Sequence, residues 1–255
     1  MMWRLFGDGP PLVLLHGGHG AWTHWIRNIP ALARHFRLYV PDMPGHGESS
    51  MPPGRLSGPG IAAVISEGLQ AMLPDGQTYH AAGFSFGGII GGCLGAHDGA
   101  RMESLTICGS NGLGLRRGTL SGFRQWRDLT DPDEIAAAHR KNLEVVMFGD
   151  PAHVDPLAVH IQSANVPASR VKTRRIADTN ILAKVLPEVQ ARLHGIWGAC
   201  DGYAKMYMPE RADLFRAAQA DCTFHVIDDA GHWVIYEQAD AFNAVFLNNL
   251  GVREG

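Results

Sequence analysis

The stretch Thr78-Tyr-His-Ala-Ala-Gly-Phe-Ser-Phe-Gly-Gly-Ile-Ile-Gly-Gly92 decides the fold class of this chain. It begins like a short buried strand, passes through Gly83-Phe-Ser-Phe-Gly87 and ends as a glycine-rich helix start. A G-x-S-x-G turn from strand to helix exposes its serine at the end of a sheet, and only glycine tolerates the close backbone approach on either side. Such a pattern also arises by chance in glycine-rich chains, so the strand and helix around it carry the prediction that Ser85 is a nucleophile.

Short apolar runs like the one before Ser85 recur along the chain. They predict strands at 11–15, 37–40, 78–82, 104–108, 193–197 and 222–227. Continuous apolar runs that alternate with helices are typical of a parallel sheet covered on both faces. We therefore expect an α/β fold with a mostly parallel central sheet, whose ligand site lies beyond the carboxyl ends of the strands.

One region contains no convincing buried strand and is expected to form a helical lid between two strands. Asp131-Pro-Asp-Glu134 and Asp155-Pro156 read as helix starts, with Asp as the N-cap and Pro at the first helical position. We expect 1–112 and 185–255 to form the core and 113–184 the lid. Because the lid needs the edge of the sheet to cover its apolar faces, all three ranges are expected to form one folding unit.

Composition and charge exclude several classes of protein. The 255 residues carry a net charge of −3, which gives no electrostatic footprint for nucleic acid or for an anionic membrane. The four cysteines are scattered, and the amino end lacks a signal pattern, so we expect reduced thiols and a cytoplasmic location. The expected partner is a small-molecule substrate, and a homodimer is left open. The 31 glycines show no repeat, so they must serve particular backbone positions.

A serine nucleophile needs a base, and the base needs an acid that orients it. In sheets of this kind the chain order is serine, acid, histidine. His225 falls within a predicted strand, whereas His232 follows the last strand and precedes a helical stretch, so His232 is the expected base. Asp201 follows the strand at 193–197 and is the expected acid. The alternative position for the acid, Ser110-Asn111, offers no carboxylate.

The loop His16-Gly-Gly-His-Gly20 follows the first of these apolar runs and is expected to help bind the oxyanion. We predict that the backbone N–H groups of Gly18 and Phe86 form the oxyanion hole. His16 is interpreted as a hydrogen-bonding brace of the loop. A metal site at His16, His19 and His24 is the weaker alternative, because no nearby cysteine or carboxylate completes a ligand set, so no metal is expected.

The substrate pocket is harder to predict. Phe84 and Trp233 flank the nucleophile and the base and are candidates to line it. Residues 113–184 contain eleven Lys and Arg against eight Asp and Glu, a net charge of +3, which leaves −6 for the rest of the chain. We hypothesise that a basic side chain of this region attracts an anionic part of the substrate. The candidates are Arg170, Lys172, Arg174 and Arg175; the alternative is that these charges are simply solvated.

Taken together, these motifs resemble the α/β-hydrolase superfamily in its lid-bearing branch. The resemblance covers essentially the whole chain and implies hydrolysis through an acyl-enzyme, without metal or organic cofactor. It also places the first residues of the chain in the family's second strand, so that the first strand is expected to be missing. The segment around Gly231-His-Trp is similar to meta-cleavage carbon–carbon bond hydrolases. That subgroup usually has Asn before the nucleophile and a Gly-Pro-Gly oxyanion loop, where this chain has Phe84 and His19-Gly-Ala21.

These expectations define the predicted function. We expect a serine hydrolase that cleaves a small carboxylic ester, thioester or lactone. A carbon–carbon bond hydrolase of a vinylogous diketone is the nearer alternative, and a cofactor-independent perhydrolase would use the same three residues. A non-catalytic, ligand-binding member of the fold is the alternative from another class, although ligand binding alone has no need of a complete triad.

Overall fold

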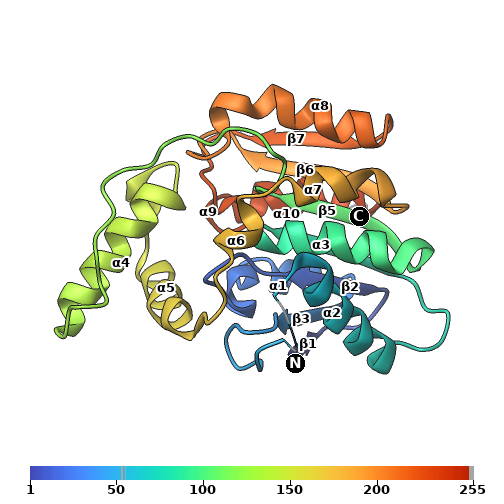
Figure 1. The fold of residues 1–255 in the computed structure, drawn as a ribbon, viewed down its shortest axis with the longest axis horizontal. Helices are drawn as coiled ribbons and strands as arrows, with labels where there is room; N and C mark the ends of the chain where they lie inside the picture. Colours follow the sequence, from blue (N-terminus) through green and yellow to red (C-terminus); the bar gives the residue numbers. More distant parts are fainter. Residues whose placement is uncertain (53, 55, 253–255) are drawn as a thin grey trace.

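The computed structural model describes residues 1–52, 54 and 56–252 of the chain. Within them, seven strands form one sheet in the order β1-β3-β2-β4-β5-β6-β7 (Figure 1). All neighbouring strands are parallel except β1 and β3. The strands are β1 Met2–Phe6, β2 Pro11–Leu15, β3 Arg37–Asp42, β4 Tyr79–Phe84, β5 Met102–Cys108, β6 Arg192–Gly198 and β7 Thr223–Ile227. The predicted mostly parallel sheet is confirmed.

The antiparallel edge strand β1 is absent from the strands that apolar runs predicted. All five residues of β2 are buried, whereas every residue of β1 is exposed or only partly buried. An edge strand with a solvated face has no continuous apolar run. Arg4 interrupts its sequence, Met2-Trp-Arg-Leu-Phe6, so the family resemblance, and not an apolar run, placed a strand there.

Helices cover both faces of the sheet, as predicted (Figure 1). Helices α2, α3, α7 and α8 contribute buried residues to the core on one face, and α1, α9 and α10 contribute to the core on the other. These helices are α1 Ile29–Leu32, α2 Gly58–Met72, α3 Phe86–Asp98, α7 Ile181–Val185, α8 Met208–Ala218, α9 Val234–Glu237 and α10 Ala239–Asn249. Short 3₁₀ turns lie at Trp22–Trp25, Gly99–Arg101, Pro151–His153, Leu186–Glu188 and Lys205–Tyr207.

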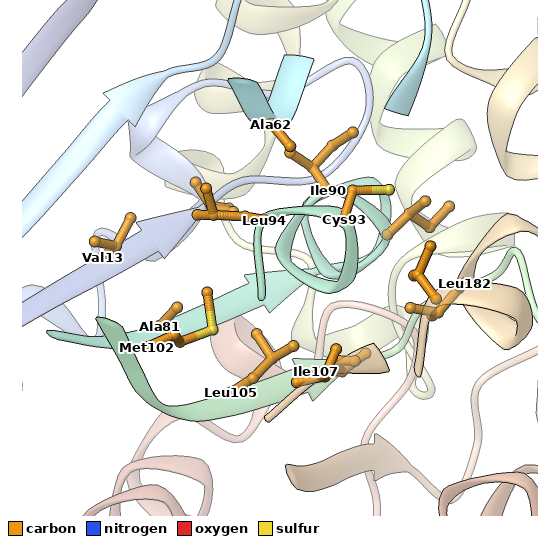
Figure 2. Packing of buried hydrophobic residues seen from close by; sticks show 14 of the residues in the cluster. Val13, Ala62, Ala81, Ile90, Cys93, Leu94, Met102, Leu105, Ile107 and Leu182 are labelled. Carbon is orange, nitrogen blue, oxygen red and sulfur yellow. The ribbon is translucent and has the colours of Figure 1, made fainter. Parts of the chain in front are cut away.

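Helix α3 lies closest to the centre of the sheet because its glycines permit close packing. Figure 2 shows Ile90 of α3 beside Ala62 of α2, while Ala81 of β4 and Leu105 of β5 lie on the strands on the other side of the helix. A Cβ atom added at Gly91 would lie 3.0 Å from a methyl carbon of Leu105. The glycine-rich start of this helix thus lets it approach the strands and fixes the turn that precedes it.

The insertion between β5 and β6 contains α4 Pro132–Val146, α5 Pro156–Ala168, α6 Arg174–Ala177 and α7. Both predicted helix starts are confirmed, since Asp131 accepts from the N–H of Asp133 (2.8 Å) and Asp155 from that of Ala158 (2.7 Å). Buried residues of α4 and α5 join the same hydrophobic cluster as α9 and α10. Figure 1 shows α4 and α5 beside one end of the sheet, with α7 over α3.

The order of the strands determines where a site can form. The chain passes from β2 to β3 on one side and then to β4 on the other side of β2. At such a reversal the loops that follow neighbouring strands diverge and leave a crevice at their carboxyl ends. The loops after β2 and β4 are those with the predicted oxyanion and nucleophile motifs. None of the helices described here is long and apolar enough to span a bilayer.

Candidate active site

Ser85 occupies the sharp turn between β4 and α3 and has a left-handed backbone, with φ of 53° and ψ of −114°. A Cβ atom at Gly83 would lie 2.3 Å from the carbonyl oxygen of Gly87, so the turn leaves no room for a side chain there. The backbone of Ser85 is held on both sides. Its N–H donates to the Cys108 carbonyl (2.7 Å), and its carbonyl accepts from the hydroxyl of Ser110 (2.7 Å). The strained turn is therefore fixed by β5 and by the residues that follow it.

The structure brings Ser85, His232 and Asp201 together from three separate loops. Nδ1 of His232 lies 2.9 Å from Oδ2 of Asp201, and Nε2 of the same ring lies 3.0 Å from Oγ of Ser85. A carboxylate can only accept a hydrogen bond, so the Nδ1–H of His232 donates to Asp201. Nε2 then carries no proton and accepts a hydrogen bond from the Ser85 hydroxyl. Both His232 and Asp201 are almost fully buried. These contacts form a continuous hydrogen-bonded chain from a carboxylate to a hydroxyl, an arrangement that can move a proton away from a serine.

The loops that carry Asp201 and His232 support each other. The other carboxylate oxygen of Asp201, Oδ1, accepts from the Tyr203 N–H (2.9 Å), and the Cys200 N–H donates to the Ala230 carbonyl (2.8 Å). A Cβ atom at Gly198 would lie 2.2 Å from the carbonyl oxygen of Gly231, so the two loops touch through their backbones. The orientation of the carboxylate toward the imidazole is thus fixed by backbone packing.

Glu237 is a supporting residue that the sequence analysis missed. Its side chain is fully buried and accepts from the N–H groups of Gly231 (2.6 Å), Gly149 (2.9 Å) and Asp150 (3.1 Å). His153 also contacts it at 3.0 Å. The carboxylate therefore joins the loop of His232 to the segment between α4 and α5. A charged residue at the end of the apolar run Trp233-Val-Ile-Tyr-Glu237 was the available signal.

The loop after β2 is braced by histidines, as expected for His16. Its Nδ1–H donates to the Gly17 carbonyl (2.8 Å), and its Nε2 accepts from the Met43 N–H (2.9 Å). The Gly17 N–H donates to Nδ1 of His24 (3.2 Å). Both predicted oxyanion donors, Gly18 and Phe86, line the same cavity as Ser85. Neither N–H donates to an acceptor within the described part of the chain, so both are available to a ligand.

Beneath this loop the rings of His24 and His46 each make a T-shaped contact with the ring of His16, at centroid distances of 6.3 Å and 5.0 Å. Burial lowers the pKa of His16 to about 4 and, with the neighbouring His16, that of His46 to about 3. Burial also places the pKa of His24 well below its usual value. Within the described ranges, no group of three histidines, cysteines or carboxylates could hold a metal ion.

The cavity that opens on Ser85 has a volume of about 510 Å³. Of the predicted pocket residues, Phe84 and Arg174 line it. Trp233 does not: it is fully buried, stacks on Tyr236 at 4.2 Å and donates through its indole N–H to the His24 carbonyl (3.2 Å). Although Trp233 follows His232 in the sequence, its side chain packs in the hydrophobic core and not in the cavity.

Two of the predicted basic residues lie away from the cavity. Arg170 reaches back over the loop after β3, where its guanidinium donates to the Ser49 carbonyl. Arg175 is exposed and, like Lys172, is not among the described residues that line the cavity. The basic residues that join Arg174 there are Arg117, Arg124 and Arg127, together with the buried His139. All four arginines lie within 113–184, the region with the excess of positive charge, but Arg174 is the one among them that the sequence analysis named.

Comparisons with known proteins agree with this geometry. The model of the alpha/beta hydrolase family matches residues 12–245. A hydrolase of known structure from Pseudomonas aeruginosa superposes with a TM-score of 0.72 at 26% identity, over 98% of this chain and 93% of the other. A meta-cleavage product hydrolase from Pseudomonas fluorescens gives a TM-score of 0.78 at 20% identity, over 98% and 93%. The predicted resemblance to the α/β-hydrolase superfamily is confirmed. The similarity to the meta-cleavage product hydrolase, at 20% identity, shows a shared fold.

Three curated relatives differ in their named activities. The dihydrolipoyllysine-residue acetyltransferase component of the acetoin cleaving system of Pseudomonas putida is 31% identical, over 94% of this chain and 63% of the relative. Pimeloyl-(acyl-carrier protein) methyl ester esterase of Aeromonas hydrophila is 33% identical, over 47% of this chain and 48% of the esterase. 2-Hydroxymuconate semialdehyde hydrolase of a Pseudomonas species is 28% identical, over 92% and 85%. The match spans less than two thirds of the first two relatives.

Proposed function

Since this chain belongs to the α/β hydrolase family, we propose that it is a serine hydrolase that cleaves a small carboxylic ester, thioester or lactone through an acyl-enzyme. One observation carries the proposal, namely the hydrogen-bonded chain from Asp201 through His232 to Ser85 at the wall of a cavity. The named esterase among the relatives supports the choice of an ester.

The reaction begins with Ser85. Its Oγ attacks the carbonyl carbon of the substrate while Nε2 of His232, 3.0 Å away, takes the hydroxyl proton. The carbonyl oxygen becomes an oxyanion and accepts from the N–H groups of Gly18 and Phe86. Collapse of the tetrahedral intermediate breaks the bond to the leaving group, which takes the proton from His232. Water then attacks the acyl-enzyme by the same route and releases the acid and Ser85.

Asp201 acts through His232. By accepting from Nδ1–H, it keeps Nε2 free of a proton before attack, and its negative charge stabilises the imidazolium that forms afterwards. We also propose that 113–184 acts as a lid over the reacting groups. Residues from several parts of it, among them Arg124, His139 and Thr173, line the same cavity as Ser85, which supports this role.

A series of p-nitrophenyl esters from acetate to decanoate tests the proposal. We expect the wild type to hydrolyse short chains and Ser85→Ala to lose about 10⁴-fold or more in kcat/KM. Ser121→Ala, at an exposed serine of the insertion, is the matched control and is expected to keep full activity. A fluorophosphonate probe is expected to label the wild type and the control but not Ser85→Ala. Equal hydrolysis by Ser85→Ala and the wild type would refute the assignment.

Carbon–carbon bond hydrolysis is the second candidate, because the named semialdehyde hydrolase aligns with 92% of this chain. The two activities use the same three residues and differ in the bond that is broken. Turnover of a ring-fission diketone without turnover of any ester would favour this candidate. Absence of turnover with both substrate types, in a protein that still binds small molecules, would favour a non-catalytic member of the fold.

A further inference from the structure

The cavity at Ser85 is strongly cationic. Four arginines line it, and all four come from the insertion: Arg117, Arg124, Arg127 and Arg174. No aspartate or glutamate is found among the described residues that line it. Arg124, Arg127 and Arg174 are exposed at the mouth of this cavity. A concave surface lined by one sign of charge concentrates ligands of the opposite sign, and arginine is the residue best suited to bind carboxylate or phosphate oxygens.

Three of these arginines are not neutralised by the protein. Arg117 pairs with Asp178 and lies over the ring of Tyr203, so its charge is already balanced. Arg124, Arg127 and Arg174 form no salt bridge with any carboxylate of residues 1–52, 54 and 56–252. Three guanidinium groups without counter-ions therefore share one cavity.

The segment that carries Arg124 and Arg127 is attached to helix α4 at defined positions. Asn142 of α4 accepts from the Arg124 N–H (2.8 Å) and donates to its carbonyl (3.0 Å). The guanidinium of Arg127 lies 4.8 Å from the centre of the Trp126 ring, and that ring lies 5.0 Å from the ring of His139. The segment that carries both arginines is thus attached to α4 by a paired amide and by a stack of rings.

His139 gives a second, independent sign that a polar ligand belongs here. Its side chain is 1% exposed and lines the cavity, yet neither ring nitrogen has a hydrogen-bond partner among the described residues. A buried polar atom without a partner costs stability, so such groups are normally satisfied by protein, water or ligand. Burial lowers the pKa of His139, which keeps the ring neutral and able to donate one hydrogen bond and accept another.

The positive charges extend to the oxyanion loop. Burial, Arg127 and Arg174 together lower the pKa of His19, the residue that follows the predicted oxyanion donor Gly18. Both arginines line the same cavity as Ser85 and Gly18, so one substrate bound there can meet both.

We infer that the substrate carries an anionic oxygen group, a carboxylate or a phosphate, which is bound by Arg124, Arg127 and Arg174 beside a hydrogen bond from His139. The inference rests on the proposed function and names its substrate class: esters or thioesters whose acyl part ends in an anion. Arg117, balanced by Asp178, and the exposed Arg175 lie outside this anion subsite.

Three esters of similar length test the inference: mono-p-nitrophenyl glutarate, p-nitrophenyl 4-phosphonobutanoate and the neutral p-nitrophenyl pentanoate. We expect the wild type to prefer at least one anionic ester over the neutral one by about tenfold or more in kcat/KM, the size of a charge-assisted hydrogen bond. Which anion is preferred distinguishes carboxylate from phosphate. In Arg124→Gln/Arg127→Gln this ratio is expected to fall about tenfold or more. It is also expected to fall in 0.5 M NaCl, since salt screens exposed charges.

Arg175→Gln is the matched control, because it removes a neighbouring, equally exposed charge of the same insertion that is not among the described residues lining the cavity. It is expected to leave the ratio and the rate with the neutral ester unchanged. A wild-type ratio near one, an unchanged ratio in the double variant, or an equal loss in Arg175→Gln would overturn the inference.

A binding measurement separates this inference from the proposed function. Calorimetry with glutarate and with 4-phosphonobutanoate reports the subsite even when no ester is hydrolysed. If none of the three esters is hydrolysed but one of these anions binds the wild type more tightly than the double variant, the proposed function fails and the anion subsite stands. If the neutral ester is hydrolysed but neither anion is preferred nor bound, the subsite fails and the proposed function stands.

Discussion

Lowering the pH from 7 to 5 is expected to destabilise this protein through the histidines beneath the oxyanion loop. Both ring nitrogens of His16 are already used by the neutral ring, one as donor and one as acceptor. His46 is fully buried, and its Nε2 has no partner within the described residues. Burial lowers the pKa of His16 to about 4 and that of His46 to about 3.

The size of the effect follows from the difference between folded and unfolded states. An unfolded histidine has a pKa near 6.5, so the unfolded chain takes up protons first as the pH falls below that value. The stabilising contribution of each neutral histidine is therefore complete above about pH 6.5. It is lost progressively as the pH falls toward the pKa that the histidine has in the folded protein. At about 1.36 kcal/mol per pH unit, each of the two histidines lowers the free energy of unfolding by about 2 kcal/mol between pH 7 and pH 5. Together they would remove a large part of a typical stability of about 5–15 kcal/mol.

Urea unfolding followed by circular dichroism at pH 7, 6 and 5 measures this loss. His46→Phe keeps an aromatic ring beside His16 and Phe86 but cannot take up a proton. Its loss of stability between pH 7 and pH 5 is expected to be about 2 kcal/mol smaller than that of the wild type. His97→Gln, at an exposed position, should behave as the wild type does. The same pH dependence in His46→Phe and the wild type would refute the argument.

Three further predictions concern the supports of the site. Gly83→Ala places a Cβ atom 2.3 Å from the Gly87 carbonyl oxygen and should lower the free energy of unfolding by more than about 2 kcal/mol in the same urea assay. Ser110→Ala removes the 2.7 Å hydrogen bond to the Ser85 carbonyl; it should cost about 1 kcal/mol of stability and lower kcat several-fold, and an unchanged kcat would show that the turn holds without it. Glu237→Ala leaves three backbone N–H groups without their acceptor and should lower kcat more than it raises KM, whereas Glu237→Gln should retain part of the activity.

The meeting of Ser85, His232 and Asp201 could be predicted because the topology leaves little choice. Each residue follows a strand of the sheet, and the carboxyl ends of parallel strands lie at one edge. The glycines beside them mark places where backbone touches backbone. Gly83 against Gly87 and Gly198 against Gly231 are two of the close approaches that explain the glycine excess. Local patterns sufficed wherever the chain position also determined the position in space.

The residues that line the cavity could not be predicted, because their position in the chain does not determine their position in space. Residues Gly112 to Thr130 form no helix or strand, so no periodicity indicates which side chains face inward. Arg124 and Arg127 reach the cavity because Asn142 and His139, on a helix later in the chain, hold their segment. Charge balance identified the region, but only tertiary contacts select Arg124 and Arg127 over Arg170 and Arg175.

The loop of His232 is attached to the insertion at the residues that follow α4, and this attachment bears on how a substrate can enter. The backbone N–H of Trp233 donates to the Met147 carbonyl (2.7 Å). The side chain of Glu237 joins the loop of His232 to the residues after α4. Opening the insertion there would disrupt the base and expose the buried Leu143 and Phe148. The segment Gly112 to Thr130 is mostly exposed and lacks regular structure. It is held at a few points, among them the Gly118 N–H on the Tyr203 carbonyl (3.2 Å) and the pair of Arg124 with Asn142, and segments with few buried contacts open at a low free energy. We therefore expect access to the cavity to depend on the segment that carries Arg124 and Arg127. An anionic substrate would then meet its binding charges as it enters.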